Sequence, residues 1–551
     1  MNKILRNKLF LPIILFLVTI PVLLPYAKSG YFTTHDGEWA VVRLADMYRT
    51  VRDLQIPARY SGYLNAGYGY PLFNFAYPIP YYVGLIPLIL NVGFVGSIKL
   101  LFALSVPLSA FCMFLLSRKL WKNEWAGLVS AIVYVYAPYR MVDLFVRGSI
   151  GESLSFILFP ILLYTTLRIA EKPQSIFPPV FFAILFALLI GTHNIMTVLF
   201  TPVLLVFSML LVLKTSRKSW RSFLFAGILG IGLSAFFWLP ALTEKHLIWL
   251  SETPIADRSL YFVSLNQLVI PSWGYAPPTE AGGFSYQTGI SQLILFIVSL
   301  GISVKFLISK KRTFHELLFM TLTGITGIAL FMMFRISSFI WELVPLLSEI
   351  NYPWIMLSQI VFAIAVSAGY LIVYKKIFAY PTFLLVLLAV LMTFKYAKPE
   401  EYVNRGDDFY VSNDAVTTSS NEYLPLWTDI KPPYRPEQKV EITGEGLVEN
   451  LTYNSKSISF STRLVDNVTV TVNTTYYPGW QFYSNNQPIS VTYDNEYGVM
   501  QFSLPAGTHQ IAGYFRETPL RLFANSITVL SAITILLFVF AKPVQSRFLR
   551  V

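Results

Sequence analysis

Several side chains that can carry acid–base or charge chemistry follow the first apolar run of the chain, in the stretch YFTTHDGEWAVVRLADMYRTVRD at residues 31–53. If a helix begins near Asp36, then Asp36, Ala40 and Arg43 share one face, because residues four and seven positions apart lie on the same side of a helix. Such a carboxylate takes up protons, and such a guanidinium holds anions. The spacing therefore predicts a catalytic or binding surface along one side of this helix.

The same stretch also has a purely structural interpretation. Thr33 and Asp36 have the spacing of a capping box, and the helix dipole favours a carboxylate in a first turn without any catalytic role. The two interpretations are compatible, because a helix N-terminus keeps a carboxylate ionised, which is the form that a general base needs. His35 and Glu38 are weaker candidates, since exposed polar residues beside a membrane need no special function.

A second group of charges lies in YAPYRMVDLFVRGSIGES at residues 136–153. Arg140, Asp143 and Arg147 are spaced three and four apart and form one charged face. That face is typical of an interfacial helix with an internal ion pair, or of a cationic site for phosphate, whose oxygens match the fork of an arginine. Glu152 enters the next apolar run, where an acid is costly enough to indicate function.

His193, in IGTHN, lies at the outer end of another apolar run and either satisfies neighbouring carbonyls or joins the site. The sequence has no Walker A loop, no GxGxxG after a strand, no His/Cys metal spacing and no GxSxG. Soluble nucleotide chemistry is therefore not expected. A substrate with a lipid tail and an anionic head fits carboxylates and arginines gathered at one face of a membrane.

The elements that must position these residues are membrane spans. Of 551 residues, 55% are hydrophobic and 13% charged, and the mean hydropathy is +0.56, which indicates an integral membrane protein. The net charge of +12 comes mostly from short Lys/Arg clusters between apolar runs. That is the positive-inside pattern, so the charge indicates topology rather than nucleic-acid binding.

Twelve segments are apolar enough to be predicted as spans. They lie near 9–27, 97–117, 124–138, 152–169, 177–193, 196–213, 221–242, 289–309, 315–334, 352–374, 379–396 and 521–541. An even number places both termini on one side, and both termini are basic, so we expect both in the cytoplasm. Residues 78–92 are too short and too rich in proline to cross, and we predict a re-entrant or interfacial helix on the outer face.

This topology predicts four outward segments and three parts of the chain. The outward segments are 28–96, 138–152, 243–288 and 397–520, and the parts are a transmembrane domain at 1–396, an outer domain at 397–520, and a final span with a cytoplasmic tail at 521–551. Runs such as NVTVTVNTTYY and VMQFSLPAG alternate between apolar and polar residues and are separated by turn signals. They predict an antiparallel β-sandwich of about 90 residues.

These features carry a family resemblance over nearly the whole chain. A first span, an outer HD…R helix, an aromatic GYGYP segment, an interfacial helix and a basic-flanked second span together resemble the GT-C superfamily of polyprenyl-phosphate-sugar-dependent glycosyltransferases. More narrowly, THDGEWAVVR, YGYPLFNFAYPIPYY, YAPYRMVDLFVRGSIGE and FFWLPALTE resemble a bacterial membrane family labelled 6-pyruvoyl-tetrahydropterin synthase-related. The tail YYPGWQFYSNNQPISV…FSLPAGTHQI is similar to the C-terminal domain of YfhO-like membrane proteins. The pterin label implies a zinc site, and the sequence has no such His cluster.

The resemblance implies a polytopic GT-C-like helical membrane protein that transfers a sugar, with inversion, from a polyprenyl phosphate to an extracytoplasmic glycan, lipid or cell-wall polymer. GT-C enzymes generally carry an essential acid in the first outer loop, and Asp36 matches that position, as general base. Arg147 or Arg43 would stabilise the phosphate. The candidate residues are Asp36 and Glu152 for catalysis, and His35, Glu38, Arg43, Arg140, Asp143, Arg147 and His193 for substrate binding.

The resemblance also sets expectations for metal, location and partners. GT-C members that use a metal, Mg²⁺ or Mn²⁺, often show a further acidic pair in a later outer loop, and here that loop supplies only Glu152, so the metal requirement stays open. The expected partners are the lipid donor, an outer acceptor and membrane lipids. The expected location is the cell (plasma or inner) membrane, with the active site and the sandwich outside. In the sandwich, Tyr476, Tyr477 and Trp480 could stack on sugars, and we expect at least two of them in its core.

Two other functions fit the same residues. A transporter or flippase of a lipid-linked saccharide would share the cationic cavity, but it predicts sites near the midplane and repeated halves, and no internal repeat is evident. A non-catalytic cell-envelope assembly protein would be favoured if Asp36 pointed away from any cavity. The convergence of Asp36, Arg147 and Glu152 in one outward cavity would favour the enzyme.

Overall fold

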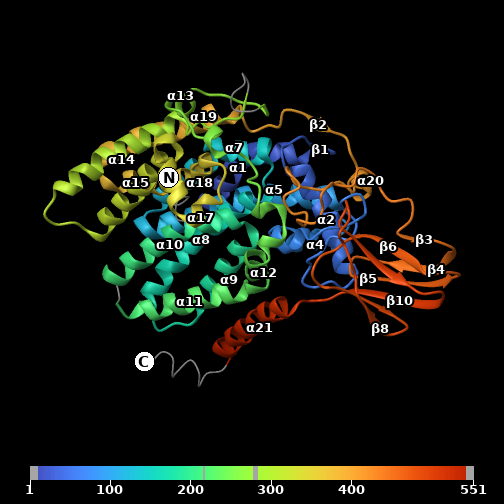
Figure 1. Ribbon diagram of the computed structural model, residues 1–551. Helices are drawn as coiled ribbons and strands as arrows, with labels where there is room; N and C mark the ends of the chain where they lie inside the picture. Colours follow the sequence, from blue (N-terminus) through green and yellow to red (C-terminus); the bar gives the residue numbers. More distant parts are fainter. Residues whose placement is uncertain (1–9, 215–216, 277–282, 541–551) are drawn as a thin grey trace.

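The computed structural model describes residues 10–214, 217–276 and 283–540, which form a helical body and a β-sandwich beside it (Figure 1). Within these ranges nine helices are long and apolar enough to cross a membrane. They are α1 (Phe10–Ala27), α5 (Phe94–Trp121), α8 (Ile150–Glu171), α10 (Asn194–Lys214), α14 (Ile290–Ile308), α15 (Phe314–Met333), α18 (Leu357–Tyr374), α19 (Lys376–Phe394) and α21 (Pro519–Phe540). The predicted polytopic helical fold is confirmed.

The three other predicted spans are short or bent. Helix α9 (Phe177–Thr192) has 16 residues. Helix α6 (Glu124–Val135) is bent by 49° against α7 (Pro138–Val142) and the π-helix that continues α7 to Arg147, and α11 (Trp220–Leu233) by 69° against α12 (Ala235–Thr243). With each bent pair as one span, the described residues hold up to eleven spans rather than twelve. The basic stretches 1–8 and 542–551, which predict cytoplasmic termini, lie outside the described residues.

The first bend has a local cause that also builds the site. Ala137 precedes Pro138 and has ψ 133°, because the proline ring disfavours a helical conformation in the residue before it. A new helical segment begins at Pro138 with α7 and continues as the π-helix. It ends at Gly148, which has φ +65°. This break converts what would be a straight span into a short helix that carries Tyr139, Arg140 and Arg147 at the edge of the helical body.

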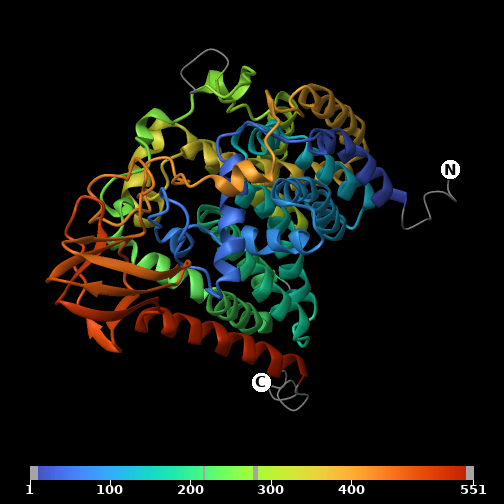
Figure 2. The same cartoon turned by 90° about the vertical axis from the view of Figure 1, so that its right-hand side faces the viewer.

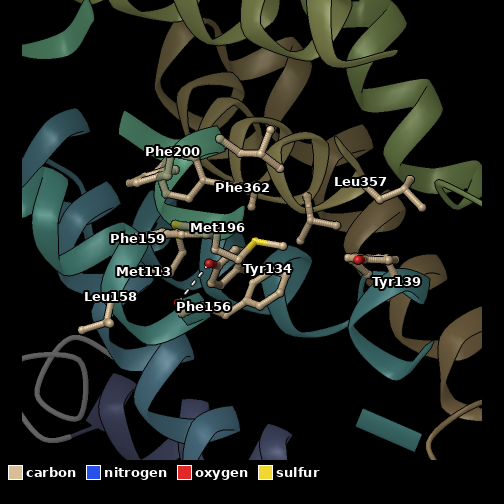
Figure 3. Close-up of a cluster of buried hydrophobic side chains, with 14 of the residues drawn as sticks. Met113, Tyr134, Tyr139, Phe156, Leu158, Phe159, Met196, Phe200, Leu357 and Phe362 are labelled. Carbon is tan, nitrogen blue, oxygen red and sulfur yellow. Dashed lines mark hydrogen bonds between the residues drawn. The ribbon is translucent and has the colours of Figure 1, made fainter. Parts of the chain in front are cut away.

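The centre of the helical body is a cluster of aromatic and sulfur side chains from α5, α6, α8, α10 and α18 (Figure 3). Phe159 stacks on Phe200 with ring centroids 4.1 Å apart, and Phe200 meets Phe362 edge-on at 5.2 Å. The hydroxyl of Tyr134 donates to the carbonyl of Phe156 at 3.0 Å, as drawn in Figure 3. This packing fixes α8 and α6, whose ends lead into the site.

Small residues let the central helix α18 approach its neighbours closely. The hydroxyls of Ser117 in α5 and Ser130 in α6 are 2.7 Å apart. A Cβ at Gly369 of α18 would lie 2.5 Å from each of them, so only glycine fits there. Small residues and interhelical hydroxyl contacts are the usual means of packing membrane helices, where lipid supplies no hydrophobic driving force.

Short elements cover one end of this body. Helix α2 (Gly37–Arg52) packs on α4 (Ile79–Ile89) and α5, with α3 (Leu72–Phe75) between α2 and α4 in sequence. Helix α4 has 11 residues, too few to span, as its length and prolines predict. Strand β1 (Tyr31–Phe32) pairs with β2 (Tyr402–Val403). The remaining short helices are α13 (Leu265–Val269), α16 (Ser338–Leu343), α17 (Pro345–Ser348) and α20 (Asp407–Ser412).

The predicted antiparallel β-sandwich is confirmed at residues 440–515. One sheet has the order β4-β5-β10-β7-β8 and the other β3-β6-β9, and every pairing is antiparallel. The strands are β3 (Val440–Thr443), β4 (Gly446–Tyr453), β5 (Ser457–Leu464), β6 (Val468–Thr475), β7 (Trp480–Ser484), β8 (Gln487–Ile489), β9 (Val499–Leu504) and β10 (Gly507–Phe515). Tyr477 and Trp480 are buried in its core and Tyr476 is half-buried, as expected for at least two of the three.

The sandwich lies beside α2 and α4, and α21 returns from it along the helical body (Figures 1 and 2). Helix α21 packs on α11 and α12. At this junction Arg521 of α21 binds the carboxylate of Glu244, with Nη2 2.8 Å and Nε 2.9 Å from its two oxygens. Asn74 and Tyr477 also donate to Glu244, so three separate parts of the chain meet at one buried carboxylate.

Candidate active site

The two charged stretches singled out in the sequence lie side by side. The backbone N–H of His35 donates to the carbonyl of Val146 at 2.9 Å, and that of Asp36 to the carbonyl of Arg147 at 2.8 Å. Gly148 makes this approach possible: a Cβ there would lie 2.4 Å from Oγ1 of Thr34. Segments more than 100 residues apart in sequence are thereby held in contact at the backbone.

Helix α2 begins at Gly37, with Asp36 as its N-cap residue. The predicted capping pair of Thr33 and Asp36 is wrong, because the cap is made by the hydroxyl of Thr34, which accepts from the N–H of Gly37 at 2.8 Å. The side chain of Asp36 makes no capping hydrogen bond. The carboxylate of Asp36 therefore makes no hydrogen bond to the end of α2 and can face the cavities beside it.

Two cavities meet at Asp36. The larger has a volume of about 450 Å³, and His35, Arg147, Tyr352 and Trp354 are among its lining residues. The smaller has a volume of about 130 Å³ and is lined along one side of α2 by Asp36, Trp39, Ala40 and Arg43. Asp36, Ser419 and Glu422 line both cavities. The face predicted from the spacing of Asp36, Ala40 and Arg43 thus forms a cavity wall.

Glu422 is the site residue that sequence reasoning missed. It comes from the segment between β2 and the sandwich, where no regular pattern marks it, and its distance from Asp36 along the chain exceeds 380 residues. Its Oε2 accepts from the N–H of Ser420 at 3.0 Å, and its carbonyl accepts from the N–H of Leu250 at 2.8 Å. These contacts hold a second carboxylate at the wall that Asp36 also lines.

Arg147 reaches the larger cavity from a buried ion cluster. Its Nη1 pairs with Glu152 and donates to the hydroxyl of Tyr139 at 3.1 Å, while that hydroxyl donates to the other oxygen of Glu152 at 2.7 Å. Its guanidinium carbon lies 4.7 Å from the ring centre of Trp354, another lining residue. Glu152 is fully buried behind Arg147, so it contacts the cavity only through that arginine.

Arg140 and Asp143 lie deeper in the same cluster. Arg140 Nη1 is 3.3 Å from Asp143, whose carboxylate also accepts from the hydroxyl of Ser153 at 2.6 Å and lies 3.8 Å from Arg147. Both residues are buried, so an interfacial helix with one lipid-facing side is not what this stretch forms. Neither lines the two cavities, and their contacts lead to Arg147 and Ser153 rather than to a ligand.

The other predicted site residues have different surroundings. His35 lines the larger cavity, with Nε2 3.2 Å from the carbonyl of Tyr275, and partial desolvation lowers the pKa of its ring, so it is neutral at pH 7. Glu38 points away from both cavities and pairs with Arg405 at 2.8 Å. His193 is buried and stacks on Tyr77, one of the smaller cavity's lining residues.

Arg43 lines the smaller cavity, but each of its three nitrogens already donates to a neighbouring oxygen. Nε donates to Oγ1 of Thr417 at 2.9 Å, Nη2 to the carbonyl of Thr417, and Nη1 to the hydroxyl of Tyr81 at 3.4 Å. Thr417 is five residues before Glu422. Arg43 therefore anchors the segment that delivers Glu422, and Arg147 is the cation with donors left for a ligand.

The donor set does not build a metal site of the usual kind. Across residues 10–214, 217–276 and 283–540 no group of three or more His, Cys, Asp or Glu side chains is placed to hold a metal ion. Two carboxylates, Asp36 and Glu422, line the cavities, and the cation of Arg147 lines the larger cavity with them.

Comparison with known proteins gives a family match and one curated relative. Residues 73–398 match the family described as 6-pyruvoyl-tetrahydropterin synthase related domain, membrane protein. An uncharacterized protein of Lactococcus lactis subsp. cremoris (strain MG1363) is 25% identical over 312 residues, which cover 55% of this chain and 50% of that protein. The chain thus spans about half the length of the curated relative that it matches.

Several solved structures are partly similar. The apo oligosaccharyltransferase of Archaeoglobus fulgidus has a TM-score of 0.43 at 12% identity, covering 76% of this chain and 61% of its own. The arabinofuranosyltransferase AftD from Mycobacteria has a TM-score of 0.45 at 15% identity, covering 71% of this chain and 27% of its own. AglB of Archaeoglobus fulgidus, solved with an inhibitory peptide and a dolichol-phosphate, has a TM-score of 0.40 at 15% identity, covering 75% and 60%.

Proposed function

This chain belongs to the family of membrane proteins described as 6-pyruvoyl-tetrahydropterin synthase related, and we propose that it transfers a sugar from a polyprenyl phosphate to an extracytoplasmic hydroxyl acceptor. One observation carries the proposal. Asp36, Glu422 and Arg147 line a single cavity between the helical body and the outer segments. A base and a cation in one partly enclosed space are what transfer from a phosphate leaving group requires.

Asp36 acts as the general base. Its carboxylate takes the proton of the acceptor hydroxyl while the acceptor oxygen forms a bond to the anomeric carbon. The bond from that carbon to the phosphate oxygen breaks with its electron pair, which leaves on the phosphate, and the configuration inverts. The position of Asp36 supports this role, because its side chain makes no hydrogen bond to the end of α2 and the residue lines both cavities. Such a base contributes about 10²–10⁴-fold to the rate.

Arg147 receives the negative charge that develops on the leaving phosphate. Its ion pair with Glu152 and its hydrogen bond to Tyr139 fix the guanidinium before the substrate arrives. A cation held in advance, in a space with aromatic walls, stabilises developing charge without reorganisation during the reaction. Glu152 is a positioning residue in this scheme, which gives a reason for an acid at the start of a membrane helix.

Glu422 and the aromatic walls bind the sugar. One carboxylate oxygen of Glu422 accepts from the backbone at Ser420, which leaves the other for sugar or acceptor hydroxyls. Phe284, Tyr286, Tyr352 and Trp354 line the larger cavity and present ring faces to a sugar. The isoprenoid tail lies along the neighbouring spans. A non-catalytic assembly protein would be favoured if Asp36 pointed away from any cavity, whereas Asp36 lines two cavities.

The test is transfer from a synthetic polyprenyl-phosphate sugar by the purified, reconstituted protein. Asp36→Asn is expected to lower kcat at least about 100-fold at unchanged thermal stability. Glu38→Gln is the matched control, because Glu38 lies two residues away on the same helix and faces Arg405 outside the cavities. Normal transfer by Asp36→Asn, or equal losses in both variants, would exclude the role of Asp36 as base.

The proposal also places this site outside the cytoplasm, which is tested separately. Cys112 is the single cysteine, so a Cys112→Ser background accepts one reporter. Glu252 is exposed in the segment that follows α12. Glu252→Cys in intact cells is expected to react with a membrane-impermeant maleimide. Labelling that appears only after the cells are permeabilised would place the site in the cytosol and end the proposal.

A further inference from the structure

A third and larger cavity lies at the other end of α2. Its volume is about 920 Å³, within the range of about 300–1,000 Å³ typical of ligand sites. Its walls come from the last turns of α2, the segments 62–67 and 435–440, the end of α20, and strand β4. Arg49 lies 13 residues after Asp36 on the same helix, so the cavity is about 20 Å from the candidate active site. We call it the α2–β4 groove.

Two cations mark opposite walls of the α2–β4 groove, each beside an aromatic ring. On the helical side the guanidinium of Arg49 is 5.2 Å from the ring centre of Tyr63. On the sandwich side the ammonium of Lys439 is 5.4 Å from the ring centre of Tyr453. Arg435 adds a third cation, and Glu437 is the acid among the lining residues. The groove therefore presents mainly positive charge together with ring surfaces.

These cations keep donors for a ligand. Lys439 Nζ donates to the carbonyls of Gly67 and Asn473, both at 2.7 Å, which uses two of its three N–H groups. Burial lowers the pKa of Lys439 to about 7, so an anion in the groove would favour its charged form. Arg49 donates from Nη2 to the carbonyl of Val411 at 2.6 Å, which leaves most of its five N–H groups. Arg435 is paired with Asp414 and largely exposed.

The groove is built before any ligand binds. The N–H of Ala66 donates to the carbonyl of Asp414 at 2.8 Å, and the N–H of Thr475 to the carbonyl of Tyr68 at 2.8 Å. These bonds and the contact between Lys439 and Gly67 tie the helical side to the sandwich side. A rigid, preformed site spends little binding free energy on ordering its walls.

We propose that the α2–β4 groove binds an anionic saccharide, a short chain of sugars that carry carboxylate or phosphate groups. Arg49 and Lys439 pair with the acidic groups, since arginine and lysine are the usual partners of carboxylate and phosphate. Tyr63 and Tyr453 contact the sugar rings. A lipid is disfavoured, because none of the lining residues belongs to a helix long and apolar enough to cross a membrane in the described part of the chain. Binding of an anionic saccharide in the groove does not depend on the proposed transfer reaction. Only the identification of that saccharide as the acceptor rests on the proposed function.

The test uses the full-length purified protein and two probes of equal length, a hexamer of galacturonic acid and maltohexaose. The anionic hexamer is expected to bind at least tenfold more tightly than the neutral one in calorimetric titration. Equal affinities would overturn the proposal. Displacement of the hexamer by low millimolar inorganic phosphate, at constant ionic strength, would show a site for a small anion and would also overturn it.

Variants separate this groove from general charge and from the active site. Arg49→Gln is expected to weaken binding of the anionic hexamer at least tenfold, and Tyr453→Leu several-fold. Arg52→Gln is the matched control, because Arg52 is exposed on the same helix beside Tyr48 and does not line the groove. Equal losses in Arg49→Gln and Arg52→Gln would overturn the proposal. Asp36→Asn is expected to bind the hexamer normally, so failure of the transfer reaction and failure of the groove are distinguishable.

Discussion

Two buried arginine–glutamate pairs in this molecule have nearly the same chemistry and different surroundings. In the first, Arg147 binds Glu152, and the hydroxyl of Tyr139 donates to the same carboxylate. In the second, Arg521 binds Glu244, and the hydroxyl of Tyr477 donates to it. The side chain of Arg147 is 12% exposed and lines a cavity, whereas that of Arg521 is 0% exposed.

Under the proposed function, exposure of the arginine, rather than the pair itself, separates the cluster at the site from the cluster that only holds the fold together. Arg521 also donates from Nη1 to the carbonyl of Pro478 at 2.9 Å, and Asn74 donates to Glu244. All of these partners belong to the junction of the helical body, the sandwich and α21. Arg147 instead directs part of its guanidinium to open space. A buried ion pair alone is weak evidence for either role.

The largest expected effect is on stability at the closed pair. Glu244→Gln leaves Arg521 buried without a carboxylate and should cost about 3–5 kcal/mol. Glu152→Gln should cost less, because Arg147 reaches the cavity and has Asp143 at 3.8 Å as a second partner. Thermal unfolding of both variants in the same detergent measures the contrast. Equal losses of Tm would break the distinction based on exposure.

The next effect is on catalysis at the open pair. Arg147→Lys keeps the charge but loses the planar fork, and we expect kcat for sugar transfer to fall at least about tenfold. Arg521→Lys should lower Tm while the folded protein keeps its kcat. Both variants are assayed at a temperature well below the lower Tm. A drop in kcat for Arg521→Lys as large as that for Arg147→Lys would contradict the assignment of roles.

The two tyrosines give a matched comparison. Tyr139→Phe and Tyr477→Phe each remove one hydroxyl that donates to a buried carboxylate, which should cost about 1.5–3 kcal/mol in unfolding free energy. Only Tyr139→Phe should also lower kcat, since the Tyr139 hydroxyl accepts from Arg147 at 3.1 Å. Steady-state kinetics and thermal unfolding of the pair test this, and an unchanged kcat in Tyr139→Phe would argue against prior positioning of Arg147.

The smallest effect concerns His35, which lies in the same cavity as Arg147. Desolvation is the main reason that the pKa of His35 is lowered in the folded protein, and the positive charge of Arg147 adds a smaller decrease. Below about pH 6.5 the unfolded chain binds a proton that the folded chain resists, so stability falls as the pH decreases. His35→Gln should flatten the loss of Tm between pH 6.5 and 5.5, whereas Glu244→Gln should leave that slope unchanged.

Elements with a regular period were predictable from the sequence. Apolar runs located the helices of the body, alternation located the sandwich, and the spacing of Asp36, Ala40 and Arg43 placed them on one face. Pro138 marks a bend, whereas a prediction based on length alone treats this region as one straight span. The cap on α2 is made by Thr34 rather than Thr33, a shift of one residue that spacing rules do not resolve.

Contacts between distant segments were not predictable, because no local pattern encodes them. Glu422 meets the cavity through a stretch without regular structure, and the pairing of Arg521 with Glu244 joins residues 277 positions apart. The sequence marks Arg140 and Asp143 as strongly as Arg147, since all three share one periodic face. Only the packing of the helices around them decides that Arg147 alone reaches the cavity.

The origin of Glu422 has a consequence for biosynthesis. A ribosome that has translated the first 400 codons has already produced every span before α21, together with Asp36 and Arg147. The wall formed by Ser419 and Glu422 does not yet exist. The nascent protein can therefore insert and pack these spans while its cavity is still open on one side, and the wall is complete only once Ser419 and Glu422 have been synthesised.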